Sequence, residues 1–94
     1  MFEWDEAKNA ANIAKHGLSF KEAVQAFDGP VFTIVDDRVD YGELREISIG
    51  LIEDRAIIAI VHTDRQGRTR LISARRANRK ERALYHGHYS QESQ

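Results

Sequence analysis

Apolar residues recur at helical spacing in two short segments of the first third of the chain. The first segment, from about Glu6 to His16, has a narrow apolar stripe of Ala7, Ala10, Ala11, Ile13 and Ala14. Asp5 before it is a suitable N-cap, and Gly17 after it can adopt the left-handed conformation that ends many helices. These signals predict one short helix over residues 6–16.

A second helix is predicted directly after the first. Ser19 is followed three residues later by Glu22, a capping box in which each side chain bonds a backbone N–H group that would otherwise be unpaired. This helix would present four apolar residues to the core, namely Phe20, Ala23, Val24 and Phe27. Gly29-Pro30 stops it. Because only Leu18 separates the first helix's end from the second cap, the two helices must form a tight corner or hairpin.

Beyond Pro30 the apolar pattern becomes that of β-strands. Four strands are predicted, over residues 31–35, 45–52, 56–61 and 69–74. The second alternates between apolar and polar residues, as in a half-buried strand, and the third is an unbroken apolar run typical of a central strand. Short polar turns connect consecutive strands as hairpins. The sequence therefore predicts a mostly antiparallel four-stranded sheet, to which the amino terminus could add a short extra strand.

A basic helix is predicted to follow the sheet. Asn78 and Glu81 have the spacing of a second capping box, and the helix would fray near Gly87 before a polar tail. The order of elements is two helices, a four-stranded meander and a basic helix, with no linker or repeat. We therefore expect an α+β fold of the RelE-like type in a single domain over residues 1–94.

Composition excludes several classes of protein. The chain has 94 residues and no cysteine, so disulfides and thiolate metal sites are unavailable. It begins without the basic and apolar segments of a signal peptide, and no apolar stretch approaches the ~20 residues needed to span a bilayer. We expect a soluble cytoplasmic protein with a modest core and no contact with membrane.

Charge is divided unevenly along the chain. Residues 65–94 carry eight basic residues against two acidic ones, whereas residues 1–64 carry six basic against thirteen acidic. The net charge of −1 therefore hides a cationic final third, which is densest between Arg75 and Arg82. Such an asymmetry points to a polyanionic partner, which could be RNA, DNA or an acidic protein.

Several motifs, taken together and in order, resemble the BrnT toxins of bacterial type II toxin–antitoxin modules, which are similar in fold to RelE-type ribonucleases. The matching segments are Phe2-Glu3-Trp4-Asp5, Lys8-Asn9 with Asn12, Lys15 to Ala23, Phe27-Asp28, Arg45 with Ile49-Gly50, His62-Thr63, Ile72 to Ala77, and Glu81-Arg82 with Tyr85. The resemblance covers nearly the whole chain. It implies an RNA-cleaving inhibitor of translation and growth, neutralised by a ribbon-helix-helix antitoxin, BrnA, whose complex with the toxin binds operator DNA.

The chemistry of RNA cleavage without metal or cofactor suggests particular residues. The ribose 2′-OH is the nucleophile, so a site must remove its proton, protonate the leaving 5′-oxygen and stabilise a charged phosphorane. Arginine suits the last task, and Arg75 and Arg79 are close enough in sequence to converge on one phosphate. His62, at the end of the predicted central strand, is the best general acid or base. We predict a catalytic site of His62, Arg65, Arg75 and Arg79.

A surrounding rim should bind the RNA backbone and bases. Its predicted members are Arg76, Lys80, Arg82, Tyr85, Lys8 and Lys15. Each has a structural alternative: charged side chains on a helix are usually solvated, and a helical Tyr often packs in a core. At most one of Arg75 and Arg76 can share the face of His62, because successive residues of a strand point to opposite faces.

Other interpretations remain open at this stage. A histidine at a strand end is often a structural hydrogen-bonding group, His16 fits a helix C-terminus, and His86 with His88 could form part of a metal pair. Three carboxylates, Asp36, Asp37 and Asp40, could instead hold Mg²⁺ in a metal-dependent nuclease. The chain could also be a non-catalytic module whose basic helix binds nucleic acid or an acidic protein.

Overall fold

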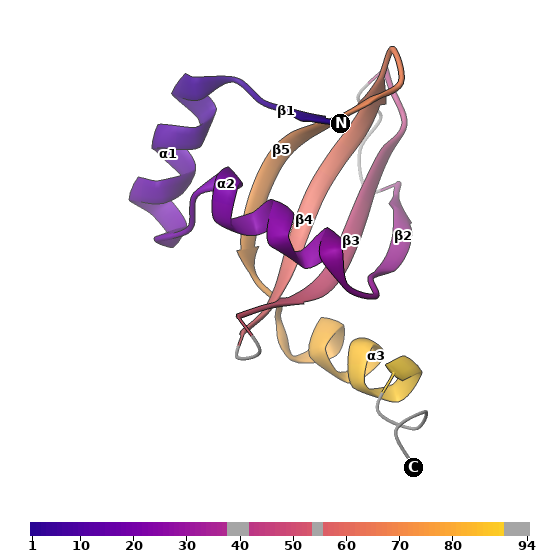
Figure 1. The fold of residues 1–94 in the computed structure, drawn as a ribbon. Coiled ribbons are helices and arrows are strands. Elements are labelled where there is room, and N and C mark those ends of the chain that lie inside the picture. Colours follow the sequence, from indigo (N-terminus) through magenta and orange to yellow (C-terminus); the bar gives the residue numbers. More distant parts are fainter. Residues whose placement is uncertain (38–41, 54–55, 90–94) are drawn as a thin grey trace.

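A five-stranded sheet with helices on both faces forms the protein (Figure 1). The computed structural model describes residues 1–37, 42–53 and 56–89. Its elements are β1 (Phe2–Glu3), α1 (Glu6–His16), α2 (Phe20–Ala23), the 3₁₀ turn η1 (Val24–Asp28), β2 (Phe32–Asp36), β3 (Arg45–Ile52), β4 (Ala56–Arg65), β5 (Arg68–Arg76) and α3 (Arg79–Tyr89). In this part of the chain, no helix is long and apolar enough to cross a membrane.

The sheet is mixed, with strand order β1-β5-β4-β3-β2. Strands β2 to β5 pair antiparallel as predicted, but β1 pairs in parallel with β5 through Phe2 and Glu3. The possible extra strand at the amino terminus is thus present, but its parallel direction was not predicted, because two residues that pair with a distant strand give almost no periodic signal in the sequence. Gln66 and Gly67 form the β4–β5 turn with positive φ angles of 56° and 80°.

The helix boundaries follow the predicted caps. Asp5 Oδ1 accepts a hydrogen bond from the Ala7 N–H group (2.8 Å), and Gly17 ends α1 with a left-handed φ of 68°. The capping box of Ser19 and Glu22 is present, and α2 continues as a 3₁₀ turn instead of a longer α-helix. The second predicted helix is thus two short pieces, bent to follow the sheet.

The glycine at position 50 allows η1 to lie close against β3. A Cβ atom on Gly50 would stand 2.9 Å from a Val31 methyl group and 3.1 Å from the Cβ atom of Ala26. Those contacts are shorter than van der Waals distances, so any larger residue would push the 3₁₀ turn away from the strand. The sequence pattern alone marked this position only as an outward-facing residue of a strand.

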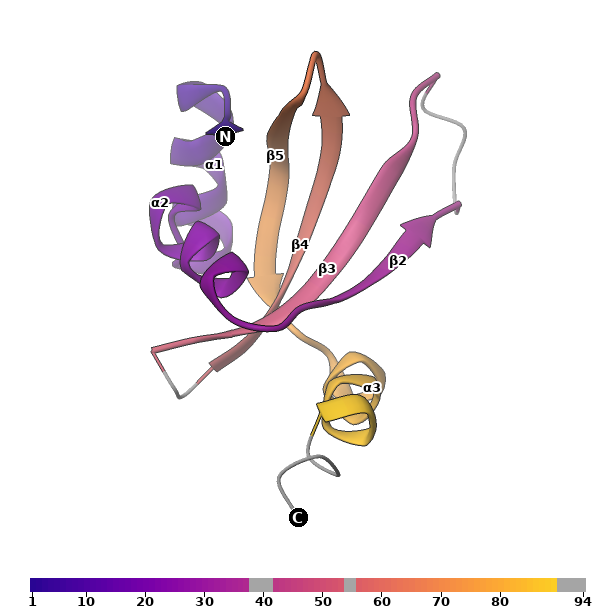
Figure 2. The same ribbon diagram turned by 45° about the vertical axis from the view of Figure 1, so that its right-hand side comes forward.

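Two hydrophobic cores lie on the two faces of the sheet. The first core lies beneath α1, α2 and η1 and is made of Leu18, Phe20, Ala23, Ala26, Ile52, Ile58, Ile60, Leu71 and Ala74. The second lies on the α3 side and is made of Ile47, Ile49, Ala59, Val61, Ala77 and Tyr85. Figure 2 shows α1 and α2 on one side of the sheet and α3 below it, near the carboxyl end of β5. The central strand β4 contributes to both cores, as its unbroken apolar run predicted.

Helix α1 contacts the sheet through an amide and not through its apolar stripe. All five residues of the stripe, Ala7, Ala10, Ala11, Ile13 and Ala14, are exposed, whereas Asn12 is buried. The Asn12 amide nitrogen donates to the carbonyl oxygens of Leu18 and Ala74 (2.8 Å each), and its Oδ1 accepts from the Ala74 N–H group (3.1 Å). The side chain thus pairs with β5 as a neighbouring strand would, beyond the end of β1.

Candidate nucleic-acid interface

Arg75 and Arg76 point to opposite faces of β5. Arg75 stands opposite Ala59, a residue of the core beside α3, and Arg76 stands opposite Ile58, a residue of the core beneath α1 and α2. Successive residues of a strand alternate in this way, as the sequence predicted. His62 packs its ring edge against Phe27 of η1, with ring centroids 5.6 Å apart. The sheet therefore separates His62 from Arg75.

Arg75 holds α3 to the last strand. Its guanidinium forms a bidentate pair with the buried carboxylate of Glu81, with N···O distances of 2.7 and 2.9 Å. The same carboxylate accepts from the Asn78 N–H group (2.8 Å), while Asn78 Oδ1 accepts from the Glu81 N–H group (2.8 Å). The second predicted capping box is confirmed. Its acidic member also binds Arg75, which gives this arginine a structural role.

His62 lies inside the sheet and not at its rim. Strand β4 continues to Arg65, and alternation along it places His62 on the face of Ile58 and Ile60, so the imidazole points towards η1. His62 is only 7% exposed, and its Nε2 lies 2.7 Å from Ser48 Oγ, which in turn lies 2.8 Å from Thr33 Oγ1. Burial lowers the pKa of His62, partly offset by the charge of Glu46. A neutral, hydrogen-bonded imidazole covered by Phe27 fits a structural group.

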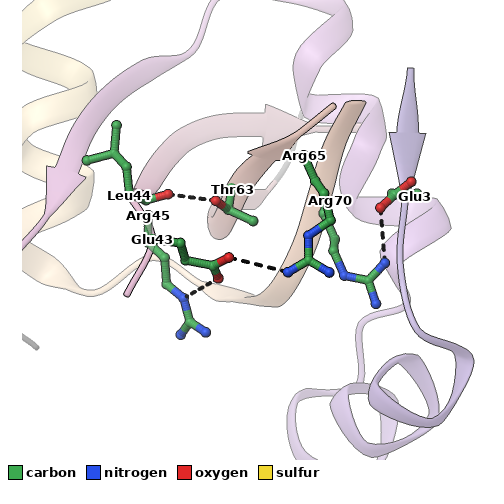
Figure 3. A network of polar contacts seen from close by, with 7 residues as sticks. All are labelled: Glu3, Glu43, Leu44, Arg45, Thr63, Arg65 and Arg70. Atoms are coloured by element: carbon green, nitrogen blue, oxygen red, sulfur yellow. Dashed lines mark hydrogen bonds and ion pairs between the residues drawn. The ribbon is translucent and has the colours of Figure 1, made fainter. Parts of the chain in front are cut away.

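Arg65 lies far from Arg75 along the sheet. It ends β4 opposite Arg68, whereas Arg75 lies near the other end of β5. Its guanidinium pairs with Glu43 (3.3 Å), which also pairs with Arg45 (3.4 Å), and Figure 3 shows this network beside the bond from Thr63 to the Leu44 carbonyl.

Across the same end of the sheet, Arg70 pairs with Glu3 of β1 at 3.1 Å (Figure 3). The four residues predicted to be catalytic therefore occupy different places. His62 is buried towards η1, Arg65 ends β4, and Arg75 with Arg79 lies near the start of α3. They do not form one site, because strand alternation and strand length separate them.

The predicted RNA contacts divide into exposed and buried groups. Five side chains are exposed, as a nucleic-acid surface requires, namely Lys8, Lys15, Arg76, Lys80 and Arg82, and so is Arg79. Tyr85 is not available for stacking on a base, because its ring is buried in the core beside Tyr89, with centroids 5.0 Å apart. Burial raises its pKa, which also disfavours an ionised phenol. This burial favours the structural alternative for Tyr85.

Lys8 and Lys15 belong to α1 and not to the junction of β5 and α3. They lie on α1 and line a shallow pocket with Ile72 and Ser73 at the edge of β5. Neighbouring Asn9 accepts a hydrogen bond from the Phe20 N–H group at 2.9 Å, so this part of the motif positions α2.

A cleft between α3 and the β3–β4 end of the sheet brings three cationic or titratable side chains together. It has a volume of about 470 Å³ and is lined by Leu51, Ala56, Ile57, Arg76, Ala77, Arg82 and His86. We call it the α3 cleft. Arg82 is fixed at its rim by a hydrogen bond from Nη1 to the Ala77 carbonyl oxygen (2.8 Å). A smaller pocket beside it, of about 70 Å³, shares Arg76 and Ala56 and is lined also by His16.

One spacing in the sequence could have indicated this cleft. Arg82 and His86 are four residues apart in a helix, so they share one face, one turn from each other. The spacing of His86 and His88 had also left open a metal pair. His88 instead stacks on Phe32 of β2, with centroids 5.1 Å apart.

The acidic alternative finds no support in the described residues. Asp36 is buried at the end of β2 and Asp37 is exposed, while Asp40 lies outside the described part of the chain. Among residues 1–37, 42–53 and 56–89, no group of three or more His, Asp or Glu side chains is arranged to hold a metal ion.

Known proteins share this architecture. A family model described as the ribonuclease toxin, BrnT, of type II toxin–antitoxin systems matches residues 4–81. The crystal structure of the Brucella abortus ribonuclease toxin BrnT aligns with a TM-score of 0.63 and 31% identity, covering 84% of this chain and 99% of that one. No protein with a curated description matches. With most of its length matched in sequence and in fold, the chain belongs to the BrnT family of ribonuclease toxins of type II toxin–antitoxin systems.

Proposed function

We propose that the protein is a metal-independent endoribonuclease that acts in the cytoplasm, binding RNA at the junction of β5 and α3 and inhibiting translation. The observation that carries this proposal is the α3 cleft, in which Arg76 and Arg82 line one concave surface. Guanidinium groups offer paired donors to phosphate oxygens and stay charged at every relevant pH. Two of them on one cleft suit a phosphodiester whose negative charge grows during cleavage.

The exposed cations nearby extend this surface. Arg79 and Lys80 lie in the first turn of α3, and both are exposed. Contacts of this kind position a nucleic-acid backbone without reading its sequence. Arg75, by contrast, is bound to Glu81, so we assign it the task of fixing α3 and not that of contacting phosphate.

The proposed partner is a ribbon-helix-helix antitoxin that covers the basic surface and carries the complex to operator DNA. The cationic final third of the chain requires acidic residues on such a partner for charge complementarity. Association should then be faster at low salt, because long-range attraction between exposed charges is screened as ionic strength rises. An association rate that does not change with salt would contradict this placement of the antitoxin.

Cleavage of RNA in the presence of EDTA tests the enzymatic proposal. We expect the wild-type protein to cut RNA under these conditions, and Arg76→Ala to cut it ~100-fold more slowly, a loss typical of removing one charge-stabilising donor. Arg65→Ala is the matched control, since that arginine ends β4 away from the cleft and should retain activity.

Two results would favour other functions. RNA binding without any cleavage would indicate the non-catalytic module, in which the basic helix binds nucleic acid or an acidic protein. Cleavage that stops in EDTA and returns with Mg²⁺ would indicate metal-dependent chemistry.

A further inference from the structure

We propose that His86 is the general base of RNA cleavage and that the α3 cleft accepts a single-stranded RNA segment. This inference rests on the proposed ribonuclease function and assigns residues to its chemistry. His86 lines the cleft with Arg76 and Arg82, and it is exposed at the surface of α3.

The three side chains reach the cleft from two elements. Arg76 is the last residue of β5, while Arg82 and His86 lie one turn apart on α3. The orientation of α3 against β5 is fixed by the bidentate pair of Arg75 with Glu81. A rigid anchor beside the cleft keeps catalytic groups at constant separation, which proton transfer and phosphate binding both require.

The floor of the cleft indicates the class of substrate. Leu51, Ala56 and Ile57 are half-buried apolar side chains among the cationic groups. An apolar surface beside arginines can hold the face of an unstacked base while the phosphate lies on the guanidinium groups. The volume of about 470 Å³ falls within the ~300–1,000 Å³ of typical ligand sites. Bases stacked inside a duplex cannot reach such a floor, so the substrate is single-stranded RNA.

The chemical step balances with His86 as base. A neutral imidazole nitrogen takes the proton of the ribose 2′-OH, and the 2′-oxygen forms a bond to phosphorus while the bond from phosphorus to the 5′-oxygen breaks. The 5′-oxygen takes a proton from water at the mouth of the cleft, and His86 later returns its proton to solvent. Arg76 and Arg82 stabilise the charge of the phosphorane. The products are a 2′,3′-cyclic phosphate and a 5′-hydroxyl.

The other histidines are less suited to this role. His62 is buried against η1, and His88 lies against Phe32 of β2; neither lines the α3 cleft. His16 lies beside Arg76 in a pocket of only about 70 Å³, too small to admit a nucleotide. Any histidine can exchange a proton near neutral pH, so the choice among the four rests on position. Only His86 lines the α3 cleft.

His86→Gln and His88→Gln form a matched pair for the test. Both replace an imidazole by an amide on the last two turns of α3, but only the first changes the cleft. With a short single-stranded RNA in EDTA, we expect His86→Gln to lower the cleavage rate at least ~100-fold, the usual contribution of a positioned base. His88→Gln should cut at nearly the wild-type rate, and thermal unfolding of both variants should show that each is folded.

A second RNA substrate shows whether His86 acts as a general base or as a general acid. An RNA whose scissile 5′-oxygen is replaced by sulfur has a leaving group that needs no proton. If His86 is the base, the His86→Gln variant still cleaves this substrate slowly. The cleavage rate of the wild-type protein should rise with pH near neutrality, and that of the variant should not. Full recovery of the rate on the sulfur substrate would overturn the assignment as base.

Cleavage by the wild-type protein and by His86→Gln tests the role of His86 separately from the proposed ribonuclease function. If the wild-type protein cleaves RNA in EDTA and His86→Gln cleaves it equally well, the role of His86 is wrong and the ribonuclease remains. Equal cleavage of duplex and single-stranded RNA would overturn the assignment of the substrate class. If the wild-type protein cleaves no RNA under any of these conditions, both proposals are wrong.

Discussion

The helices on the two faces of the sheet are attached in different ways. On one face, α1 is held by Asn12, whose amide bonds Ala74, a residue 62 positions away in the chain. On the other, α3 is held by Glu81, whose carboxylate bonds Asn78 and Arg75, three and six positions away. The polar anchor of α1 on the sheet is thus non-local and that of α3 is local, while Tyr85 and Tyr89 also pack α3 against the sheet through non-local contacts.

This difference separates stability from function in the molecule. The layer of α1, α2 and η1 seals a core and buries its polar groups against the sheet backbone. The α3 layer leaves exposed arginines and a cleft at the end of β5. Changes in the first layer should therefore affect folding, whereas changes on the cleft face of α3 should affect RNA chemistry with little loss of stability.

Removing the amide of Asn12 should give the largest loss of stability. Asn12→Ala leaves the Ala74 N–H group and two carbonyl oxygens unpaired in a buried place, which should lower the free energy of unfolding by ~4 kcal/mol. Asn9→Ala is the control, since Asn9 is less buried and accepts from only the Phe20 N–H group, and should cost ~1 kcal/mol. Urea unfolding measures both, and equal losses would show that the Asn12 contact does not hold α1.

Glu81→Ala should cost somewhat less, ~3 kcal/mol, because it removes both a capping box and a bidentate pair that is largely buried. Glu22→Ala removes the exposed capping box of Ser19 and should cost only ~1 kcal/mol. A double-mutant cycle with Arg75→Ala isolates the ion pair. A coupling energy near zero between Arg75 and Glu81 would contradict the local anchoring of α3.

Protonation of His62 should make stability depend on pH. Its folded-state pKa lies below the ordinary value of 6.5, so the unfolded chain takes up the proton first as pH falls. Stability is therefore complete above pH 6.5 and declines as pH falls from there towards the folded pKa, by ~1.4 kcal/mol for each unit of difference. His62→Gln should flatten this slope in urea unfolding. The same slope in both proteins would mean that another group is responsible.

Glu43→Gln should have the smallest effect. The pair of Glu43 with Arg65 is exposed at the end of β4, so its loss should change the free energy of unfolding by ~0.5 kcal/mol or less. RNA cleavage should not change, because neither Glu43 nor Arg65 lines the α3 cleft. A large loss of cleavage in this variant would move the active surface to the other end of the sheet.

Much of the fold could be read from local patterns. The cap at Asp5, the end of α1 at Gly17 and both capping boxes depend on neighbouring residues, and all four are confirmed. The antiparallel order of β2 to β5 follows from short hairpin connections. The possible amino-terminal strand is present as β1, but its parallel pairing with β5 was not predicted, because it brings together residues more than sixty positions apart, for which local periodicity carries no information.

The candidate site was harder to read for the same reason. Alternation along β5 correctly predicted that Arg75 and Arg76 diverge, but not which of them would be bound by a carboxylate. Glu81 has the signature of a capping residue, and its second role depends on where α3 lies relative to the sheet. Local spacing also did not show that α3 turns the Tyr85 side chain into the core, which disfavours its predicted contact with RNA.

Composition and short-range spacing are enough to predict the order of the elements, their caps, the cationic final third and the resemblance to the BrnT family. The packing of distant segments sets which polar side chains are buried and which lie at the surface. Asn12 and His62 were drawn inside by the packing of helices on the sheet, and Arg76, Arg82 and His86 were brought to one cleft. Burial and convergence arise from contacts between distant segments, so no local pattern could fix them.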